Sequence, residues 1–405
     1  MNVGRRQPLN LSVIVPLGIT QTIGYGSIYY AYTVLAGPIA ADTGLSLSTV
    51  FGCFSLGLLA GAAVAPSAGR LLDRFHPARV MAWSSAAAAL LLASWALLPG
   101  ALAFVALTAL VQAVSVLLFY EAAFVAAARL APNDARRTIT GITLIAGFAS
   151  TIFWPLTAWL VRDMSWRDVY LIYAALHLLV CAPLHLYLSG GGLNARLQRR
   201  SGADAADGDE QGMGLGNHKR RAVYWLLQCS FAANAYVIAA VHLHLIGILG
   251  ALGLGVAAAS IGALIGPAQV GGRILEFVGG SRVSIFAASI AAAGLLPVAL
   301  LVLLLGAPAL PAGIAFAVLF GVGQGLSYIV RGVLPLAIFG AAGYGALTGR
   351  FNLVRLVLSA SAPFITAVML DRGGTNLALA SIIAAALAGV AALTLAVPYL
   401  RLKSS

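Results

Sequence analysis

One arginine stands inside an apolar stretch near the C-terminal end of the chain, with polar side chains around it at helical spacing. Arg355 lies about ten residues into the stretch 346–370. The polar positions follow one another at intervals of 4, 3, 4 and 7 residues: Thr348, Asn352, Arg355, Ser359 and Thr366. A helix places these positions on one face, and a guanidinium on that face can bind a carboxylate. The alternative is that Arg355 pairs with a buried acid.

Two further stretches carry polar side chains in the same way. Gln324, Tyr328 and Arg331 are spaced 4 and 3 residues apart, and Gln21 and Tyr25 are spaced 4 apart. We expect Gln324, Tyr328, Gln21 and Tyr25 to line a substrate cavity. Arg331 lies near the end of its stretch, so its guanidinium either contacts substrate or extends to the membrane surface.

Glu121 is the one acid clearly within an apolar stretch. Its neighbours on a helix are apolar: Leu117, Leu118, Phe124 and Val125. Burial among such residues favours the protonated carboxyl, and a carboxyl that gains and loses a proton is what a proton-coupled carrier requires. The alternative is a structural acid paired with an arginine of a facing helix.

Four charged residues lie at the ends of apolar stretches, where we expect a gate: Asp73, Arg74, Arg273 and Glu276. The carboxylate of Asp73 can pair with a helix N-terminus or with arginines in one conformation and lose those contacts in another. We therefore expect Asp73, Arg74 and Glu276 to act in gating. Arg273 shares a helix face with Glu276, and both a gating role and a substrate contact stay open for it.

The composition shows which elements hold these side chains. Of the 405 residues 61% are apolar and only 9% are charged, with a mean hydropathy of +0.96; a soluble domain is about a quarter charged. An apolar run of about 20 residues spans a membrane as a helix. Twelve such runs are present: 11–36, 47–68, 79–98, 101–130, 138–161, 168–188, 222–249, 254–277, 283–305, 311–336, 346–370 and 377–399. The sequence therefore predicts an all-α membrane protein with twelve transmembrane helices.

The charges between the runs predict its orientation. The chain has 24 Lys and Arg against 12 Asp and Glu, a net charge of +12. Alternate loops carry 20 of these cations on one side and three on the other, with Arg355 inside a span. Positive loops face the cytoplasm, which places both termini there. The excess is an orientation signal, and we expect no nucleic-acid partner.

The two halves of the chain repeat each other. Gly69-Arg70-Leu71-Leu72-Asp73 returns as Gly272-Arg273-Ile274-Leu275-Glu276. At one further constant offset, Thr140-Gly141, Pro155 and Asp163 return as Thr348-Gly349, Pro363 and Asp371. Such duplication is typical of transporters that rock two bundles about a midplane site. We expect two six-helix bundles, 1–188 and 222–405, joined by a cytoplasmic linker, 189–221.

A motif between the second and third runs resembles the signature loop of the major facilitator superfamily. It reads Gly69-x-Leu71-x-Asp73-Arg74, with Arg79 following. Gly24-Tyr25-Gly26-Ser27 and the glycine-rich run 339–349 are similar, more weakly, to its monocarboxylate and oxalate/formate exchanger branch. The resemblance implies two pseudo-symmetric six-helix bundles and transport by alternating access. In the exchanger branch it implies a substrate arginine at the position of Arg273.

These features predict a secondary active transporter of the bacterial-type inner membrane. It would move a small organic anion, coupled to protons, as a monomer in the lipid bilayer. Export of cationic drugs, or transport of an aromatic metabolite or vitamin, is the alternative; Arg355 would repel a cation. No HExxH, GxSxG or P-loop motif occurs, and His242 and His244 are spaced for different helix faces. We therefore expect no enzyme activity, no cofactor and no metal.

Overall fold

The computed structural model describes residues 10–98, 100–190, 212–279 and 283–400. Within these residues all regular structure is helical, and ten helices are long and apolar enough to cross a membrane. Two of the ten, Asn217–Gly279 and Tyr344–Tyr399, have 63 and 56 residues, far more than one crossing needs. Each is broken at a glycine with positive φ, Gly253 at 81° and Gly374 at 65°. The predicted all-α fold with twelve spans is confirmed.

The first half forms six spans from helices α1 to α10. Two spans, α3 and α4, are single continuous helices, and the other four contain breaks or π-helical turns. In chain order the elements are α1 Leu11–Gly24, η1 Tyr25–Tyr30, α2 Ala31–Thr43, α3 Leu47–Arg74, α4 Pro77–Leu97, α5 Ala101–Ser115, α6 Tyr120–Leu130, η2 Pro132–Asp134, α7 Ala135–Ala146, α8 Ala149–Asp163, α9 Trp166–Leu176, η3 His177–Cys181 and α10 Ala182–Ser189.

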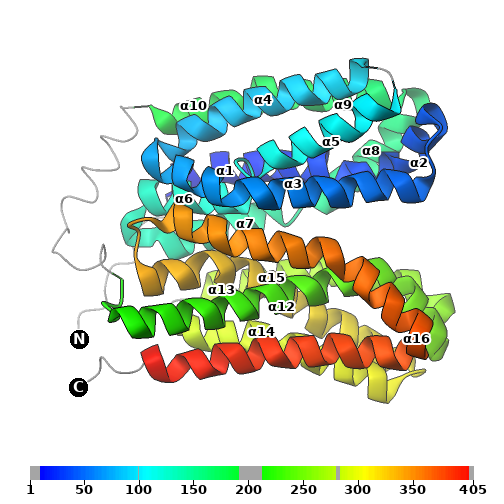
Figure 1. Cartoon of the computed structure of the whole chain (residues 1–405), viewed down its shortest axis with the longest axis vertical. Helices are drawn as coiled ribbons and strands as arrows, with labels where there is room; N and C mark the ends of the chain where they lie inside the picture. The colour runs from blue at the N-terminus through cyan, green and yellow to red at the C-terminus, as the bar shows by residue number, and fades with distance from the viewer. Residues whose placement is uncertain (1–9, 99, 191–211, 280–282, 401–405) are drawn as a thin grey trace.

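The second half contains the remaining spans, and it lies below the first half in Figure 1. Its elements are α12 Asn217–Leu249, η4 Gly250–Leu254, η5 Gly255–Ala257, α13 Ala258–Gly279, α14 Ile285–Gly306, α15 Leu310–Phe339 and α16 Tyr344–Leu400. Helix α10 ends and α12 begins at the left of Figure 1, where α16 also ends. We call this the linker end of the molecule.

Two helices that start away from the linker end, α3 and α9, are capped by local hydrogen bonds. The hydroxyl of Ser46 accepts a bond from the backbone N–H of Thr49 at the start of α3. Ser165 and Asp168 form a reciprocal capping box at the start of α9. Such caps satisfy N–H groups that a helix leaves unpaired, so α3 and α9 begin at defined residues.

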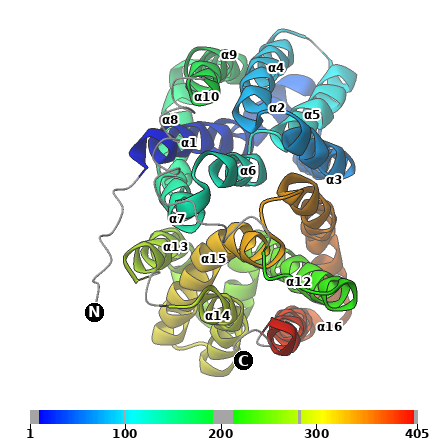
Figure 2. The same ribbon diagram turned by 90° about the vertical axis from the view of Figure 1, so that its left-hand side faces the viewer.

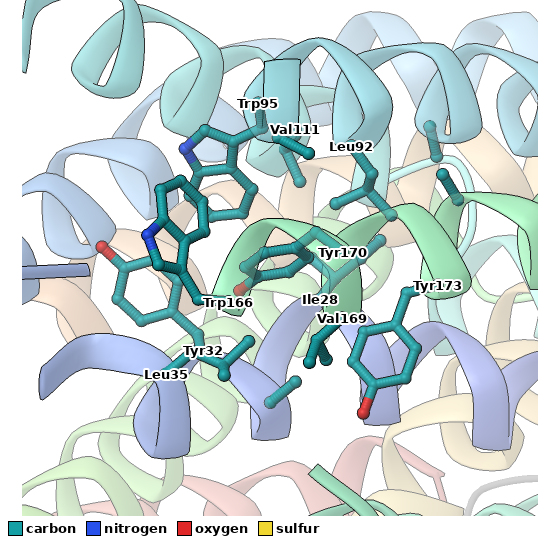
Figure 3. Close-up of a cluster of buried hydrophobic side chains, with 14 of the residues drawn as sticks. Ile28, Tyr32, Leu35, Leu92, Trp95, Val111, Trp166, Val169, Tyr170 and Tyr173 are labelled. Atoms are coloured by element: carbon teal, nitrogen blue, oxygen red, sulfur yellow. The ribbon is translucent and has the colours of Figure 1, made fainter. Parts of the chain in front are cut away.

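An aromatic cluster fills the first half away from the linker end (Figure 3). Tyr32, Trp95 and Tyr170 are buried, and their rings lie 5.7 Å and 4.6 Å apart between centroids, with Trp95 in the middle. The hydroxyl of Tyr32 donates to the carbonyl of Val50 at 2.6 Å. Tyr32 is therefore a core residue of this half and does not face a cavity.

The two halves meet along α3, α6 and α7 of the first and α13, α15 and α16 of the second, as the end view in Figure 2 shows. Backbone approaches there are very close. A Cβ added to Gly69 would lie 2.1 Å from the carbonyl oxygen of Gly345, and one added to Gly349 would lie 2.4 Å from that of Ala65. Only glycine permits this distance between α3 and α16.

Candidate functional site

An acid from the first half meets two arginines from the second at the centre of this interface. One carboxylate oxygen of Glu121 lies 3.4 Å from Nε of Arg331 and 3.4 Å from Nη2 of Arg355. The three side chains are 9%, 13% and 19% exposed. Arg355 also donates from Nε and Nη2 to Oδ1 of Asn352, at 2.9 and 2.5 Å. The polar face predicted around Arg355 thus holds an ion pair that crosses between the halves.

The expectation that Glu121 lies in apolar surroundings is wrong, because it considered only the residues of its own helix. Its partners come from α15 and α16. Glu121 lies in the first turn of α6, which restarts at Tyr120 after a break in the span. A helix N-terminus stabilises a carboxylate, so the break places this acid where both the helix and the arginines favour its charged form.

The break between α5 and α6 explains the position of Gln21. Its side-chain amide is completely buried and donates to the carbonyl of Leu118, one of the groups that the break leaves without a helical partner. Gln21 therefore supports the segment that carries Glu121. Tyr25 lies beside it, with its ring stacked on that of Phe119 at 4.2 Å.

Arg273 lies in the same interface, and one of its hydrogen bonds crosses to the first half. Its side chain is 2% exposed, and Nη1 donates to the carbonyl of Thr143 at 2.6 Å. Nη2 donates to Gln269 of its own helix at 3.2 Å. A Cβ added to Gly147 would lie 2.6 Å from Nη1. The carbonyl of Thr143 also accepts from the backbone N–H of Gly147 at 2.9 Å, and Gly147, at the break between α7 and α8, leaves the space for this guanidinium.

Tyr328 stands between two of the arginines. The guanidinium carbons of Arg273 and Arg331 lie 5.0 and 5.1 Å from the centroid of its ring, within the range of cation–π contacts. Arg331 lies against Tyr120 as well, at 5.9 Å. Nε and Nη2 of Arg331 have no hydrogen-bond partner among the described residues. Arg331 is thus buried in the centre, and the alternative that it extends to the membrane surface is wrong.

A small cavity of about 10 Å³, room for about one water molecule, lies beside the ion pairs. Its walls come from α6, α12, α15 and α16, so both halves contribute. The lining residues are Glu121, Phe124, Phe231, Arg331, Thr348, Phe351, Asn352 and Arg355. Ser359 and Gln324 are not among them, although Gln324 is buried and its Oε1 has no partner among the described residues.

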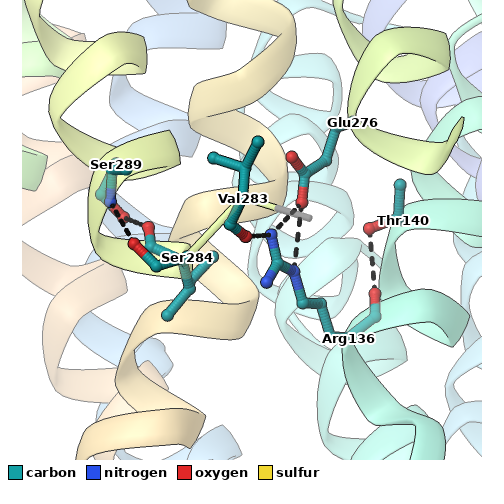
Figure 4. A network of polar contacts seen from close by, with 8 residues as sticks. Arg136, Thr140, Glu276, Val283, Ser284 and Ser289 are labelled. Carbon is teal, nitrogen blue, oxygen red and sulfur yellow. Dashed lines mark hydrogen bonds and ion pairs between the residues drawn. The ribbon is translucent and has the colours of Figure 1, made fainter. Parts of the chain in front are cut away.

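Two contacts join the halves at the linker end. Asp73 accepts hydrogen bonds from the backbone N–H groups of Gly345 and Ala346, both at 2.7 Å, at the N-terminus of α16. Glu276 accepts from Arg136 at 2.7 and 3.1 Å, and Arg136 also donates to the carbonyl of Val283 (Figure 4). These contacts hold α3 to α16 and α7 to α13.

Arg74 is placed differently from the other predicted gating residues. Arg74 lies over the ring of Phe75 at 5.5 Å, next to it in the chain, rather than against the second half. Sequence reasoning missed Arg136, which resembled any other arginine of a short loop. It also missed Tyr120 and the phenylalanines of the cavity, because an aromatic residue in an apolar run carries no sign of what it faces.

A family model for the Major Facilitator Superfamily matches residues 17–363, and no curated protein sequence matches at a significant level. The fold is similar to that of the human organic anion transporter MFSD10 (TETRAN), with a TM-score of 0.73 and 17% identity over 96% of this chain and 100% of that one. It is similar to the proton:xylose symporter XylE bound to 6-bromo-6-deoxy-D-glucose, with a TM-score of 0.67 and 14% identity over 97% of both chains. It is also similar to FucP in the outward conformation, with a TM-score of 0.65 and 14% identity over 97% of this chain and 100% of that one.

Proposed function

Since this chain belongs to the Major Facilitator Superfamily, whose members are membrane transporters, we propose that it moves a small organic anion of the carboxylate type by alternating access. One observation carries this proposal. Arg331 and Arg355 share one acid, Glu121, and Arg273 lies nearby against the same ring, Tyr328, as Arg331. Uncompensated charge is costly at membrane depth, so an excess of buried guanidinium groups favours an anionic ligand and disfavours a cationic drug. The printed name of the similar human protein, an organic anion transporter, agrees with this choice.

The substrate carboxylate binds at Arg331 and Arg355 in our proposal. Nη2 of Arg331, which has no hydrogen-bond partner among the described residues, is available to it, and Arg355 is already oriented by Asn352. Charge-assisted bonds of this kind are short and directional. Arg273 stays bonded to the first half and adds positive charge to the centre.

Proton coupling follows from competition for the same arginines. A substrate carboxylate that binds Arg331 and Arg355 displaces Glu121 from them. A carboxylate without a cationic partner in a poorly hydrated site then binds a proton. Substrate and proton therefore occupy the centre together, and they leave it together when Glu121 regains its partners.

The linker end is the cytoplasmic end in this proposal, because the loops there carry most of the cations. The protein acts as a monomer in an inner membrane, with residues 1–188 and 222–405 rocking about the centre. We propose that the described conformation, with Asp73 bound to α16 and Arg136 bound to Glu276, is the one closed towards the cytoplasm. Opening that side breaks both contacts.

Transport into proteoliposomes tests the proposal. Purified protein is reconstituted, and uptake of a panel of labelled organic acids, amines and neutral sugars is followed with and without a pH gradient. We expect uptake of at least one organic acid, enhanced by the gradient. Uptake of amines or sugars alone would contradict an anion carrier, and gradient-independent uptake of the acid would contradict proton coupling.

A further inference from the structure

The lining of the cavity beside the arginines is partly aromatic. Three of its eight lining residues are phenylalanines: Phe124, Phe231 and Phe351. Phe231 and Phe351 meet edge to face with their centroids 5.3 Å apart, and Phe351 is stacked on Tyr224 at 5.1 Å. A ligand in this cavity therefore meets both charged and hydrogen-bonding groups and aromatic rings.

A second series of rings leads from the arginine centre to an accessible side chain. Arg331 lies 5.9 Å from the ring of Tyr120, whose centroid is 4.7 Å from that of Tyr25. Tyr25 is stacked on Phe119 and lies 6.5 Å from Tyr29. Tyr29 is 40% exposed, whereas Tyr120 is 3% exposed. The rings thus continue from the buried charge to a side chain that a ligand can reach.

From these two observations we infer that the transported anion is an aromatic carboxylate. Its carboxylate binds at Arg331 and Arg355, and its ring packs against the phenylalanines of the cavity. This inference rests on the proposed function and names the substrate class of that site. Aromatic side chains prefer edge-to-face and offset-stacked contacts with other rings, and guanidinium groups bind ring faces. A saturated acid of the same size makes neither of these two kinds of contact.

The cavity has to widen before it admits such a ring, and its construction allows this. Phe124 and Glu121 belong to the first half, whereas Phe231, Phe351 and both arginines belong to the second. When the halves separate, the gap opens between Phe124 and the other two phenylalanines. The widened cavity then has rings on both sides and the arginines on one side.

Ligand binding to the purified protein tests the inference. The probes are benzoate, 2-naphthoate, cyclohexanecarboxylate and hexanoate, with benzamide and benzylamine as neutral and cationic aromatic compounds. We expect benzoate to bind roughly 2- to 10-fold more tightly than cyclohexanecarboxylate, the range expected for specific ring contacts. A site that recognises only apolar surface would bind the saturated acid at least as tightly.

Matched variants locate the preference. Phe351→Leu keeps an apolar side chain at the cavity but removes the ring, and it should reduce the preference for benzoate over cyclohexanecarboxylate to about one. Phe231→Leu should do the same if Phe351→Leu fails to fold. Phe316→Leu is the control, because Phe316 is fully buried in the core of the second half and does not line the cavity.

The outcomes separate the two proposals. If aliphatic and aromatic acids bind equally, or only aliphatic acids bind, the aromatic inference is overturned while the anion carrier stands. If benzamide or benzylamine binds as well as benzoate, or no acid binds, the anion carrier itself is contradicted. A preference for benzoate that survives both Phe351→Leu and Phe231→Leu would overturn the assignment of the ring to this cavity.

Discussion

Glu121 and Arg355 come from opposite halves of the chain, and a carboxylate oxygen of the first lies 3.4 Å from Nη2 of the second. The same oxygen lies 3.4 Å from Nε of Arg331. Breaking a buried ion pair by removing one partner leaves an uncompensated charge. An anion that takes the place of Glu121 keeps the arginines paired, and a proton on the displaced Glu121 removes its charge. The pair can therefore open when substrate binds and close when it leaves.

Glu121→Gln should uncouple transport from the proton gradient. The amide keeps the shape of the side chain but neither binds a proton nor carries charge. We expect substrate exchange to persist in proteoliposomes while accumulation driven by a pH gradient is lost. Asp163→Asn is the matched control, because Asp163 is exposed at the far end of α8. Normal gradient-driven accumulation by Glu121→Gln would remove this acid from the coupling mechanism.

Asp73→Asn should shift the protein towards the conformation that is open at the linker end. The charge-assisted hydrogen bonds from Gly345 and Ala346 weaken when the acceptor is neutral, and such bonds contribute about 1.5–3 kcal/mol each. The open population should rise roughly 10-fold or more. Spin labels on α3 and α16 near the linker end, read by pulsed distance measurements, check this. Unchanged distance distributions would show that Asp73 does not hold the gate.

Reversing the charge of either Arg136 or Glu276 should open the linker end, and exchanging the two charges should close it again. Glu276→Arg places two cations together and should open the linker end, whereas the double variant Arg136→Glu, Glu276→Arg re-forms the pair. The exchange of Asp42 and Arg167 is the control, because that pair joins α2 to α9 within one half. The same spin-label distances report the result, and failure of the double variant to recover would argue against a direct pair.

Membrane orientation can be measured by cysteine labelling from outside intact cells. In a variant without the native cysteines, a cysteine at Asp163 should be labelled by an impermeant maleimide, and one at Asn133 should not. Both positions are exposed, and they lie at opposite ends of the molecule. Labelling of position 133 alone would reverse the proposed orientation.

Sequence reasoning predicted the spans well, because the length of an apolar run fixes how many helices can cross a membrane. It also predicted the polar face that holds Asn352 and Arg355, since helical spacing determines which residues share a face. Helical spacing does not show which residues of other helices pack against that face. The pairing of Glu121 with two arginines stood only as an alternative, and the contact of Arg273 with Thr143 was not predicted.

The breaks within spans were not predicted from the sequence either. The restart of α6 at Tyr120 has Glu121 as its one charged neighbour, and the break after Ala146 occurs in sequence without proline or charge. They depend on partners distant in the chain, such as Gln21 at the carbonyl of Leu118 and Arg273 at that of Thr143. A pattern within one run cannot reveal such partners.

Substrate binding and thermal stability of Arg355 variants test the central claim most directly. Both are measured on purified protein with an organic acid identified by transport. Loss of the guanidinium leaves the substrate charge without its partner, which costs about 2–5 kcal/mol, or roughly 30- to several-thousand-fold in affinity. We therefore predict that Arg355→Ala folds without binding and that Arg355→Lys binds weakly. An Arg355→Ala protein that melts early, is rescued by Glu121→Gln and then binds the acid normally would contradict the claim, because Arg355 would then serve only to pair with Glu121.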